Sequence, residues 1–590
     1  RMQNPYWIAY RNLRLNNKKR YMASAGLSYQ ILDWLNVAGR VRIDNTHSEY
    51  EGKLYASSSN TLTDGSSQGH YTVNNGQYSQ TYADVLVNIN KRIQDFTIVA
   101  NIGASYSGVT SKELGYAGPI RETGIPNLFN VYDLDNAKKR ATQVGWREAT
   151  ESIFASAEVG WKSMLYLTVT GRNDWASQLT HSPQASFFYP SVGLSAVITE
   201  MLKLPDWVDY LKVRGAFSSV GNPYPRFLTY PTYSYDANKQ DWKSQTNYPI
   251  GKLYPERTDS WEVGLDATLF KDFKLSGSFY YANTYNQTFD PRLPVSSGYD
   301  KLYVQTGYVR NYGFEAMLSY GHRWGDFGWD SSFTFSANKN EIVELVKDYV
   351  HPETGKTYNV DKLELKTDEG RGFGKAKFIL KEGGTLGDLY THADLKRDIN
   401  GNILIDDSGN VTAIDNAGDI KLGSVLPKAN LAWNNSFSYK GINAGFLLTA
   451  RLGGIVYSAT QAYLDLYGVS ETSAAARDAG GVWINGRSRV NPQSFYEVVA
   501  SQSGLPTYYT YSATNLRLQE AHIGYTVPRR WLGNVCDINV SLVGRNLWMI
   551  YCKAPFDPEA VATTNNYYQG IDYFMMPSTR NIGFNIKINF

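Results

Sequence analysis

The sequence predicts an all-β fold, a transmembrane antiparallel β-barrel, from three observations. Apolar and polar residues alternate with a period of two in segments of about ten residues, which is the length that crosses a bilayer when a strand is tilted. Very short turns alternate with long connections along the chain. The chain also ends on an alternating strand, RNIGFNIKINF. Its apolar face carries Ile582, Phe584, Ile586, Ile588 and Phe590. Taken alone, this segment also fits the edge strand of a soluble sandwich.

Composition agrees with this fold class. The 590 residues include 45 Tyr, 14 Trp and 51 Gly, with a mean hydropathy of −0.39. The sequence has no apolar run long enough for a transmembrane helix, but a barrel distributes its apolar residues by alternation, so low hydropathy is compatible with membrane insertion. The net charge of +3 argues against a nucleic-acid partner. No linker divides the chain, so we expect one barrel domain over residues 1–590.

Strand pairs can be read in order along the chain. In the clearest pair, Trp261, Val263 and Leu265 alternate up to a short turn, after which Phe273 and Leu275 continue the pattern. The opposite faces carry Asn, Ser, Lys, Glu, Asp, Thr and Arg, so the barrel interior is predicted to be polar. The four shortest predicted turns are Lys162-Ser163, Lys271-Asp272, Gly325-Asp326 and Lys440-Gly441. Further pairs are expected near residues 21–45, 82–107, 190–220 and 515–547.

The connections predict an orientation. Transmembrane barrels place short turns in the periplasm and long loops outside the cell. We count about 17 strands, an odd number, and the first, about Tyr21 to Leu32, would then run toward the periplasm. The chain is therefore expected to be the C-terminal part of a larger barrel. The long loops expected outside are about 46–81, 108–151, 223–258, 340–428, 453–514 and 551–577.

Several stretches resemble the SusC-type (SusC/RagA-like) TonB-dependent transporters of the Bacteroidetes outer membrane. They are collinear over nearly the whole chain and include NPYW at 4–7, GRNDWAS at 171–177, LKVRGAFSSVGN at 211–222, YPERTDSWEVGLDATLF at 254–270, VRNYGFEAML at 309–318, NLRLQEAHIGYTVPRRWL at 515–532, VSLVGRNLWMI at 540–550, FDPEAV at 556–561 and MPSTRNIGFNIKINF at 576–590. One departure is Val304-Gln305-Thr306-Gly307, where family members often carry an Asn-rich segment.

The resemblance implies a barrel of about 22 strands filled by a plug domain, with roughly the last 17 strands in this chain and the plug and first strands absent from it. It implies an outer-membrane, TonB-energised importer of glycans or peptides. The implied partners are a SusD-type surface lipoprotein, the TonB-ExbB-ExbD complex acting through the plug, and the outer-membrane lipids. We find no catalytic constellation and expect no enzyme activity. The alternatives are a surface receptor or adhesin and a passive porin-like barrel. The cargo, glycan or peptide, is not decided by the sequence.

Aromatic residues fall into two groups. Those at strand ends, such as Trp161, Tyr166, Trp329 and Trp548, are expected in an interfacial girdle. Those inside long loops cannot be explained by a girdle. Simple loop packing is one explanation for them, and contact with cargo or with the lipoprotein lid is the other. The candidates for such contacts are Tyr224, Phe227, Tyr230, Tyr233, Tyr463, Tyr467, Tyr508 and Tyr509.

No cofactor or catalytic metal is expected. Asp394 to Gly409 (DLKRDINGNILIDDSG) concentrates carboxylates and amides around glycines, but Ile403 stands where a calcium loop of the EF-hand type needs glycine. An exposed Asp/Asn/Gly turn is the default interpretation, and a loose calcium site is the minority one. Cys536 and Cys552 lie near opposite ends of one predicted strand, so we expect two unpaired thiols.

Overall fold

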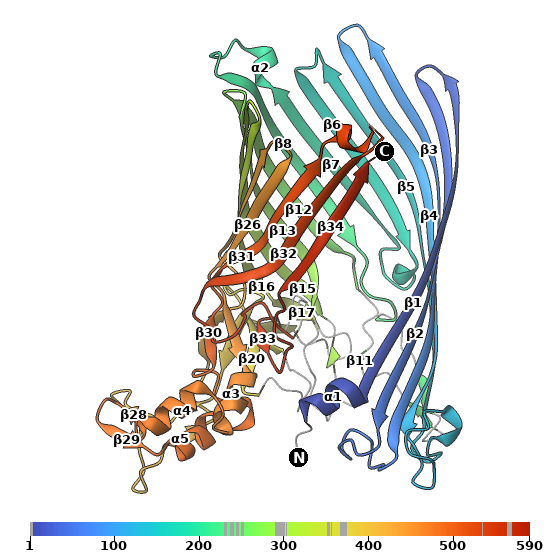
Figure 1. Cartoon of the computed structure of the whole chain (residues 1–590). Coiled ribbons are helices and arrows are strands. Elements are labelled where there is room, and N and C mark those ends of the chain that lie inside the picture. Colours follow the sequence, from blue (N-terminus) through green and yellow to red (C-terminus); the bar gives the residue numbers. More distant parts are fainter. Residues whose placement is uncertain are drawn as a thin grey trace. The chain divides into compact units, whose positions relative to one another are not determined.

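The computed structural model describes residues 4–228, 233–236, 241–243, 247–248, 253–289, 301–302, 304–350, 355, 357–365, 374–533, 535–562 and 569–589. These residues include a 17-stranded antiparallel sheet (Figure 1). The chain divides into two compact units. The first comprises residues 1–162, 166–192 and 219–255, and the second comprises residues 163–165, 193–218 and 256–590. The two units are described separately below.

The first unit is built from long neighbouring strands that follow one another in the chain. After α1 (Pro5–Arg11) come β1 (Asn12–Leu32), β2 (Leu35–Tyr55), β3 (Gly69–Ile93), β4 (Phe96–Pro119), β5 (Arg140–Trp161) and β6 (Leu165–Ala176). Each of β1 to β4 pairs antiparallel with the next strand. On β2, Val37, Val41 and Ile43 share one face, and Arg40 and Asp44 lie on the other. The sheet thus has an apolar face and a polar face.

These strands extend further than the sequence predicted. Two segments expected as loops, 46–81 and 108–151, are largely strand, because β2 continues to Tyr55, β3 begins at Gly69, β4 continues to Pro119 and β5 begins at Arg140. The first strand likewise begins at Asn12 rather than near Tyr21. Backbone pairing does not require apolar side chains, so the ladder continues where the apolar face gives way to polar residues such as Asn45 and His47.

The second unit contains the C-terminal strands. They are β12 (Glu256–Leu269), β13 (Phe273–Phe289), β15 (Val304–Trp324), β16 (Phe327–Glu344), β25 (Ala429–Tyr439), β26 (Ile442–Leu452), β31 (Asn515–Val527), β32 (Asp537–Cys552) and β34 (Asn581–Asn589). β7 (Ser186–Val197) and β8 (Val208–Asn222) belong partly to each unit. Ile586 and Phe584 of the last strand lie opposite Val540 and Leu542. Ile582, Phe584, Ile586 and Ile588 therefore share one face of the last strand, and Phe590 lies outside the described residues.

All four predicted short turns are confirmed. Each falls between two consecutive strands, and each includes a residue with positive φ: Lys162, Lys271, Gly325, Lys440 and Gly441. Within the second unit, aromatic rings beside these turns form a continuous row, as expected of an interfacial girdle. The row runs through Trp207, Phe270, Phe273, Tyr320, Trp329 and Phe437.

The girdle prediction is wrong for Tyr166. A Cβ atom on Gly160 would lie 2.8 Å from the Tyr166 ring, so this ring covers Gly160. Gly160 shares its face of β5 with Glu158, whose carboxylate accepts a hydrogen bond from Thr168 of β6. Tyr166 is therefore on the polar face of the sheet. Its position two residues before Thr168 decides this, since successive side chains of a strand alternate between faces.

The described parts of the predicted loops 340–428 and 453–514 fold together around one hydrophobic core. We call residues 374–428 and 453–514 the loop domain. Its core includes Phe378, Leu389, Tyr457, Val499 and Tyr509. It contains the helices α3 (Ala459–Leu466), α4 (Glu471–Asp478) and α5 (Pro492–Val499). Its short strands are β20 (Ala376–Lys381), β21 (Asp388–Thr391), β22 (Asp394–Leu395), β23 (Ala413–Ile414), β24 (Ile420–Ser424), β27 (Ile455–Ser458), β28 (Val482–Ile484), β29 (Ser488–Val490) and β30 (Thr510–Ser512).

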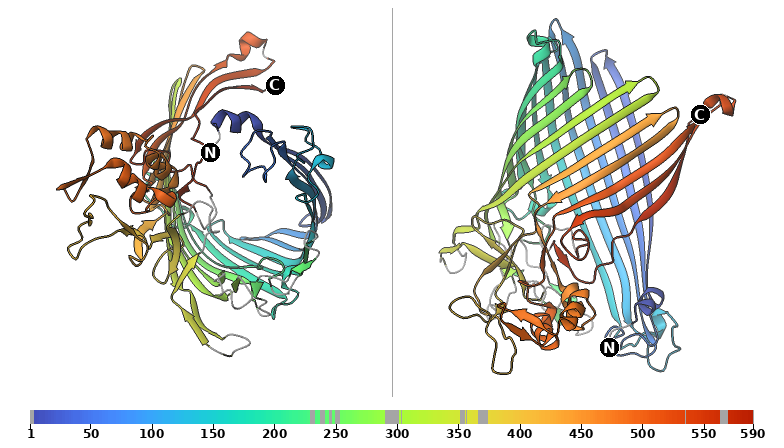
Figure 2. Two further views of the ribbon diagram at one scale, coloured as in Figure 1. Left: turned by 90° about the horizontal axis from the view of Figure 1, so that it is seen from below. Right: turned by 60° about the vertical axis from the view of Figure 1, so that its left-hand side comes forward.

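Within the second unit, α3 to α5 gather at the end of the long strands opposite to the short turns and to α2 (Ile198–Met201) (Figure 2). The other short strands are β9 (Ser234–Asp236), β10 (Asp241–Lys243), β11 (Asn247–Tyr248), β14 (Lys301–Leu302), β17 (Val346–Val350), β18 (Thr357–Val360), β19 (Lys362–Leu365) and β33 (Ile571–Asp572). Among the described residues, none of the helices is both long and apolar enough to span a membrane.

Candidate functional site: the polar wall and the loop domain

Ion pairs line the polar face of the first unit. Arg40 and Asp84 are cross-strand partners of β2 and β3, and Arg40 Nη2 donates to Asp84 Oδ2 at 2.6 Å. Arg20 of β1 pairs in the same way with Asp44 of β2. In both pairs the carboxylate is buried while the guanidinium stays more than half exposed. The arginines thus shield the acids and present hydrogen-bond donors to solvent.

A second network extends the polar face onto β6 and β7. Arg172 Nε donates to Asp174 Oδ1 at 2.7 Å, and its Nη2 donates to Ser152 Oγ at 2.7 Å. The Tyr189 hydroxyl donates to the other Asp174 oxygen at 2.5 Å. Each polar group here has a charged or hydroxyl partner, which fixes the side chains in place.

The polar face of the second unit contains a cavity of about 560 Å³. Arg214 of β8 closes one side, where it donates to Asp266 at 2.8 Å and to Glu262 at 3.1 Å. Arg451 and Glu559 lie among the other lining residues. Residues of β13, β15, β16, β25 and β26, among them Ser276, Glu315 and Thr334, complete the wall. The cavity therefore offers both signs of charge to a polar solute.

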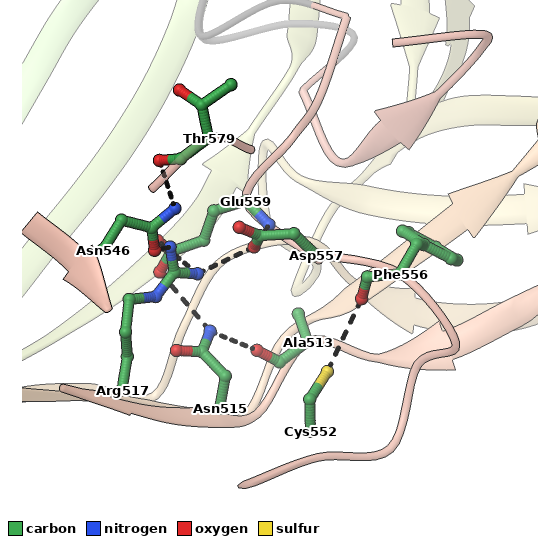
Figure 3. A network of polar contacts seen from close by, with 9 residues as sticks. All are labelled: Ala513, Asn515, Arg517, Asn546, Cys552, Phe556, Asp557, Glu559 and Thr579. Atoms are coloured by element: carbon green, nitrogen blue, oxygen red, sulfur yellow. Dashed lines mark hydrogen bonds and ion pairs between the residues drawn. The ribbon is translucent and has the colours of Figure 1, made fainter. Parts of the chain in front are cut away.

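Arg517 ties the residues around Asp557 and Thr579 to the sheet (Figure 3). Its guanidinium donates to Asp557 Oδ1 at 2.7 Å and to Asn546 Oδ1 at 2.9 Å, and lies 3.3 Å from a Glu559 oxygen. Asn546 in turn donates to the Thr579 carbonyl at 3.1 Å. Arg517 is only 5% exposed, so this is a nearly buried ion pair. Arg517, from the stretch at 515–532, and the acids Asp557 and Glu559, from the stretch at 556–561, are thereby brought together.

The charge state of Asp557 follows from this arrangement. Burial alone would raise the pKa of its carboxyl, but the hydrogen bonds from Arg517 and from the Glu559 backbone outweigh burial and hold the pKa below its usual range. Asp557 is therefore ionised at neutral pH and pairs with Arg517 as a full charge.

Tyrosines hold the loop domain together. Tyr509 is 2% exposed, and its hydroxyl donates to Asp465 Oδ2 of α3 at 3.0 Å. The fully buried Tyr457 donates to the Ser503 carbonyl at 2.5 Å. Burial, followed by the nearby Asp465 charge, raises the pKa of Tyr509 far above its usual range, so it remains a neutral donor. The helices begin at side-chain caps, Ser458 for α3 and Asn491 followed by Pro492 for α5.

The eight candidate aromatics are placed differently from one another. Tyr224 and Tyr509 are buried within their own units, so a contact with lid or cargo would require that packing to open. Tyr508 is half-buried against the loop-domain core. Phe227, Tyr233 and Tyr467 are more than half exposed, and Tyr463 is half-buried. Tyr230 lies outside the described residues.

One exposed apolar surface forms in the second unit around α3. Tyr463 contacts Phe574 and Tyr573 with ring centroids 5.3 and 6.4 Å apart. Tyr467 extends this surface with a 61% exposed side chain. We call Tyr463, Leu464, Tyr467, Val469, Tyr573 and Phe574 the α3 patch. Phe574 was missed by the sequence analysis. Its signal was the aromatic cluster YF in the predicted loop 551–577, but only folding brings it beside α3.

The carboxylates of the 394–409 segment bind their own turns. Asp398 Oδ1 accepts from the backbone N–H groups of Asn400 and Asn402, both at 2.8 Å, and Asp406 does the same with Ser408 and Asn410. A calcium ion would have to compete with these hydrogen bonds. In the part of the chain that the structure describes, His, Cys, Asp and Glu form no group of three or more that could hold a metal. Cys536 and Cys552 are both free, as predicted.

Comparison with known proteins places this geometry among the TonB-dependent receptors. The family model for the TonB dependent receptor-like β-barrel matches residues 2–547. TonB-dependent receptor P3 of Formosa agariphila is 23% identical over 99% of this chain and 60% of its own length. TonB-dependent receptor SusC of Bacteroides thetaiotaomicron is 24% identical over 67% of this chain and 40% of its own. The chain thus spans about half the length of these relatives.

Solved structures agree on the fold. A chain in the structure of the RagAB peptide transporter superposes on 99% of this chain and 63% of its own length, with a TM-score of 0.74 and 16% identity. A second structure, the RagAB peptide importer in its open-open state, gives a TM-score of 0.71 at the same identity.

Proposed function

Because the chain belongs to the TonB-dependent receptor-like β-barrel family, we propose that it forms barrel wall in an energy-coupled importer of the Gram-negative, Bacteroidetes-type outer membrane. The observation that carries this proposal is the contrast between the two faces of the sheet. The apolar face presents exposed large side chains such as Val263, Phe279 and Phe314. The polar face presents Arg–carboxylate networks and a charged cavity. Lipid on one face and an aqueous lumen on the other require this arrangement.

The proposed cargo is a glycan or a peptide. Similarity to SusC and to the RagAB peptide transporter supports these two classes. The polar face of the sheet supplies both hydrogen-bond donors and acceptors, as peptide backbones and sugar hydroxyls require. We infer transport rather than bond chemistry, because the family and the similar proteins are named as receptors and transporters.

The proposed partners follow from the same similarity. A SusD-type lipoprotein would cap the barrel, and the TonB-ExbB-ExbD complex would act through a plug domain, with roughly the last 17 of about 22 strands supplied by this chain. The α3 patch is the best seat for the lid in the second unit. It is apolar, exposed and aromatic, and aromatic anchors dominate protein interfaces. Among the candidates of the first unit, the exposed Phe227 and Tyr233 are favoured over the buried Tyr224.

Two experiments test the proposal. The first is growth of the native bacterium with and without the gene on defined glycans and peptides as sole nutrient. Loss of growth on one class supports import, and unchanged growth on all of them favours the receptor or adhesin alternative. The second is co-purification of the lipoprotein encoded with the transporter, comparing wild type with Tyr467→Ala and with the control Trp483→Ala. Trp483 is a 55% exposed aromatic of the loop domain outside the α3 patch. Equal recovery from all three proteins would remove the α3 patch as the lid seat.

A further inference from the structure

Three hollows follow one another along one face of the first unit, and we call them together the groove. Its lower part is a hollow of about 970 Å³ on β1 to β5. The floor is made of small residues, Ala25, Gly39, Ala83 and Ala104, and the walls of Leu27, Val41, Val85, Ile153, Tyr106 and Trp175. Strand register places them on one face, because Leu27, Gly39, Val85, Ala104 and Ile153 are successive cross-strand partners. Small residues among large ones create the hollow.

The same face becomes polar and then cationic further along the strands. Tyr106 also lines the next hollow, of about 320 Å³, together with Thr110 and Arg147. Beyond it lies a third hollow, of about 710 Å³, lined by His47, Gln77 and Lys112. Thr110 of β4 lies opposite Arg147 of β5. Two residues further along β4, Lys112 lies opposite Gln77 of β3, which lies opposite His47 of β2. The three hollows thus follow one another along one face of the sheet, with an apolar end and a basic end.

The basic end differs from the polar face in its charge balance. On the polar face, Arg20, Arg40 and Arg172 are each paired with an aspartate. Among the residues that the structure describes, Lys112 and Arg147 have no carboxylate partner. Unpaired cations above an apolar groove complement a molecule with acyl chains at one end and phosphate at the other.

The height of the cations selects the kind of lipid. Arg147 lies four residues along β4 from Tyr106, or about 13 Å, and Lys112 lies six residues away, or about 20 Å. At a strand tilt of about 40°, these distances give heights of about 10 and 15 Å above the apolar band. The polar layer of a glycerophospholipid leaflet is only about 5–8 Å thick. Glu151, between the apolar and basic parts, is an acceptor that suits sugar hydroxyls.

We propose that this groove binds a phosphorylated, acylated glycolipid of the outer leaflet, with an acyl chain in the Ala83–Ala104 hollow and phosphates at Arg147 and Lys112. The apolar side chains of this site lie on the opposite face of the sheet from the Arg40–Asp84 pair, and the site shares no residue with the α3 patch. The inference rests on the proposed outer-membrane location but not on the identity of cargo or lid. Nutrient uptake, measured in the same variants, reports on the importer independently of lipid binding.

The test measures lipid binding to the complete purified protein in a non-ionic detergent by native mass spectrometry. The probes are hexa-acylated lipid A with its phosphates, the same lipid A after enzymatic dephosphorylation, and phosphatidylglycerol. Wild type is expected to prefer phosphorylated lipid A over both of the others. The double variant Lys112→Gln/Arg147→Gln should bind it roughly thirtyfold more weakly, since each cation near a membrane surface contributes about a fivefold factor. Filling the hollow with Ala83→Leu/Ala104→Leu should weaken binding of both lipid A forms.

Lys91→Gln is the matched control. Lys91 lies on the same face of β3 as Ala83 but toward the short-turn end, where its ammonium sits 4.6 Å from the Trp34 ring. This variant should bind phosphorylated lipid A as wild type does. The proposal is overturned if Lys112→Gln/Arg147→Gln retains wild-type affinity, if phosphatidylglycerol binds as tightly as phosphorylated lipid A, or if filling the hollow changes nothing.

Discussion

Replacing Arg517 by Met should release residues 553–562 from the sheet. Met keeps the apolar stem of the side chain but ends near the position of Nε, so it removes three contacts: those with Asp557, Asn546 and Glu559. Asp557 would then remain as a nearly buried carboxylate, with its side chain only 10% exposed, and without its cation. The cost therefore includes desolvation of an unpaired charge as well as the loss of a hydrogen bond.

The magnitude can be ranked across the network. Breaking a buried pair by removing one partner costs about 3–5 kcal/mol, so Arg517→Met belongs in that range. Asp557→Asn keeps an oxygen that can accept from Arg517 and from the backbone N–H of Glu559, and should cost about 1–3 kcal/mol. Glu559→Gln should cost less than about 1 kcal/mol, because the Glu559 side chain is 43% exposed and its pair with Arg517 is screened by solvent.

Hydrogen exchange of the detergent-solubilised protein measures this ranking directly. Amides of residues 553–562 should lose protection in Arg517→Met by a factor of at least about a hundred, which corresponds to about 3 kcal/mol. Amides of β2 and β3 in the first unit serve as the internal control and should be unchanged. Limited proteolysis should show a new cut between residues 553 and 562.

Either of two results would contradict this ranking of the contacts. If Arg517→Met left exchange in residues 553–562 at the wild-type rate, the network would not hold the segment. If Glu559→Gln were as disruptive as Arg517→Met, exposure would not govern the strength of these pairs.

Three further outcomes are expected. Lowering the pH below about 4, the ordinary carboxyl range, should weaken the hydrogen-exchange protection of residues 553–562. The pKa of Asp557 is depressed in the folded protein, so the stability that its charge contributes is lost as the pH falls through that pKa. Asp557→Asn should abolish this pH dependence. Gly504→Ala should unfold the loop domain locally, since the φ of Gly504 is +93° and a Cβ atom there would lie 2.5 Å from Tyr509 and 2.7 Å from Ala462. The control Gly486→Ala has a positive φ but open space around it, so it should lower the free energy of unfolding by only about 1–2 kcal/mol. Equal thermal stability of the two variants would contradict this. In intact cells an impermeant maleimide should label Tyr467→Cys but not Gly325→Cys in a background with both native cysteines replaced; labelling at residue 325 alone would invert the topology.

Strand alternation and turn chemistry were sufficient to predict much of the fold. The faces of β12 to β16 and of β34 were readable because side chains alternate strictly along a strand. The short turns were readable because each is a pair of residues that interrupts the alternation between two consecutive strands. The resemblance of collinear motifs supplied the family, which the match over residues 2–547 confirms.

Strand ends and the loop domain were not predicted. The apolar band ends near Ile43 on β2, but the backbone ladder continues to Tyr55, and no hydropathy signal marks where it stops. The helices α3 to α5 are short, and their capping residues Ser458, Ser470 and Asn491 were the only local signal. The core that stabilises them joins segments on both sides of β25 and β26, so its packing is invisible to a reading of either segment alone.

The apolar face of each strand and the positions of the tight turns follow from the order of neighbouring residues, and the family follows from motifs spread along the chain. Which aromatic side chains are exposed becomes known only in the folded protein. Tyr467 and Tyr509 looked alike in the sequence, but one lies on the α3 patch and the other is buried against Asp465. Folding also brings Arg517 to Asp557, forty residues apart along the chain. Burial and ion pairing depend on distances through space, and those distances are set only when separate segments pack together.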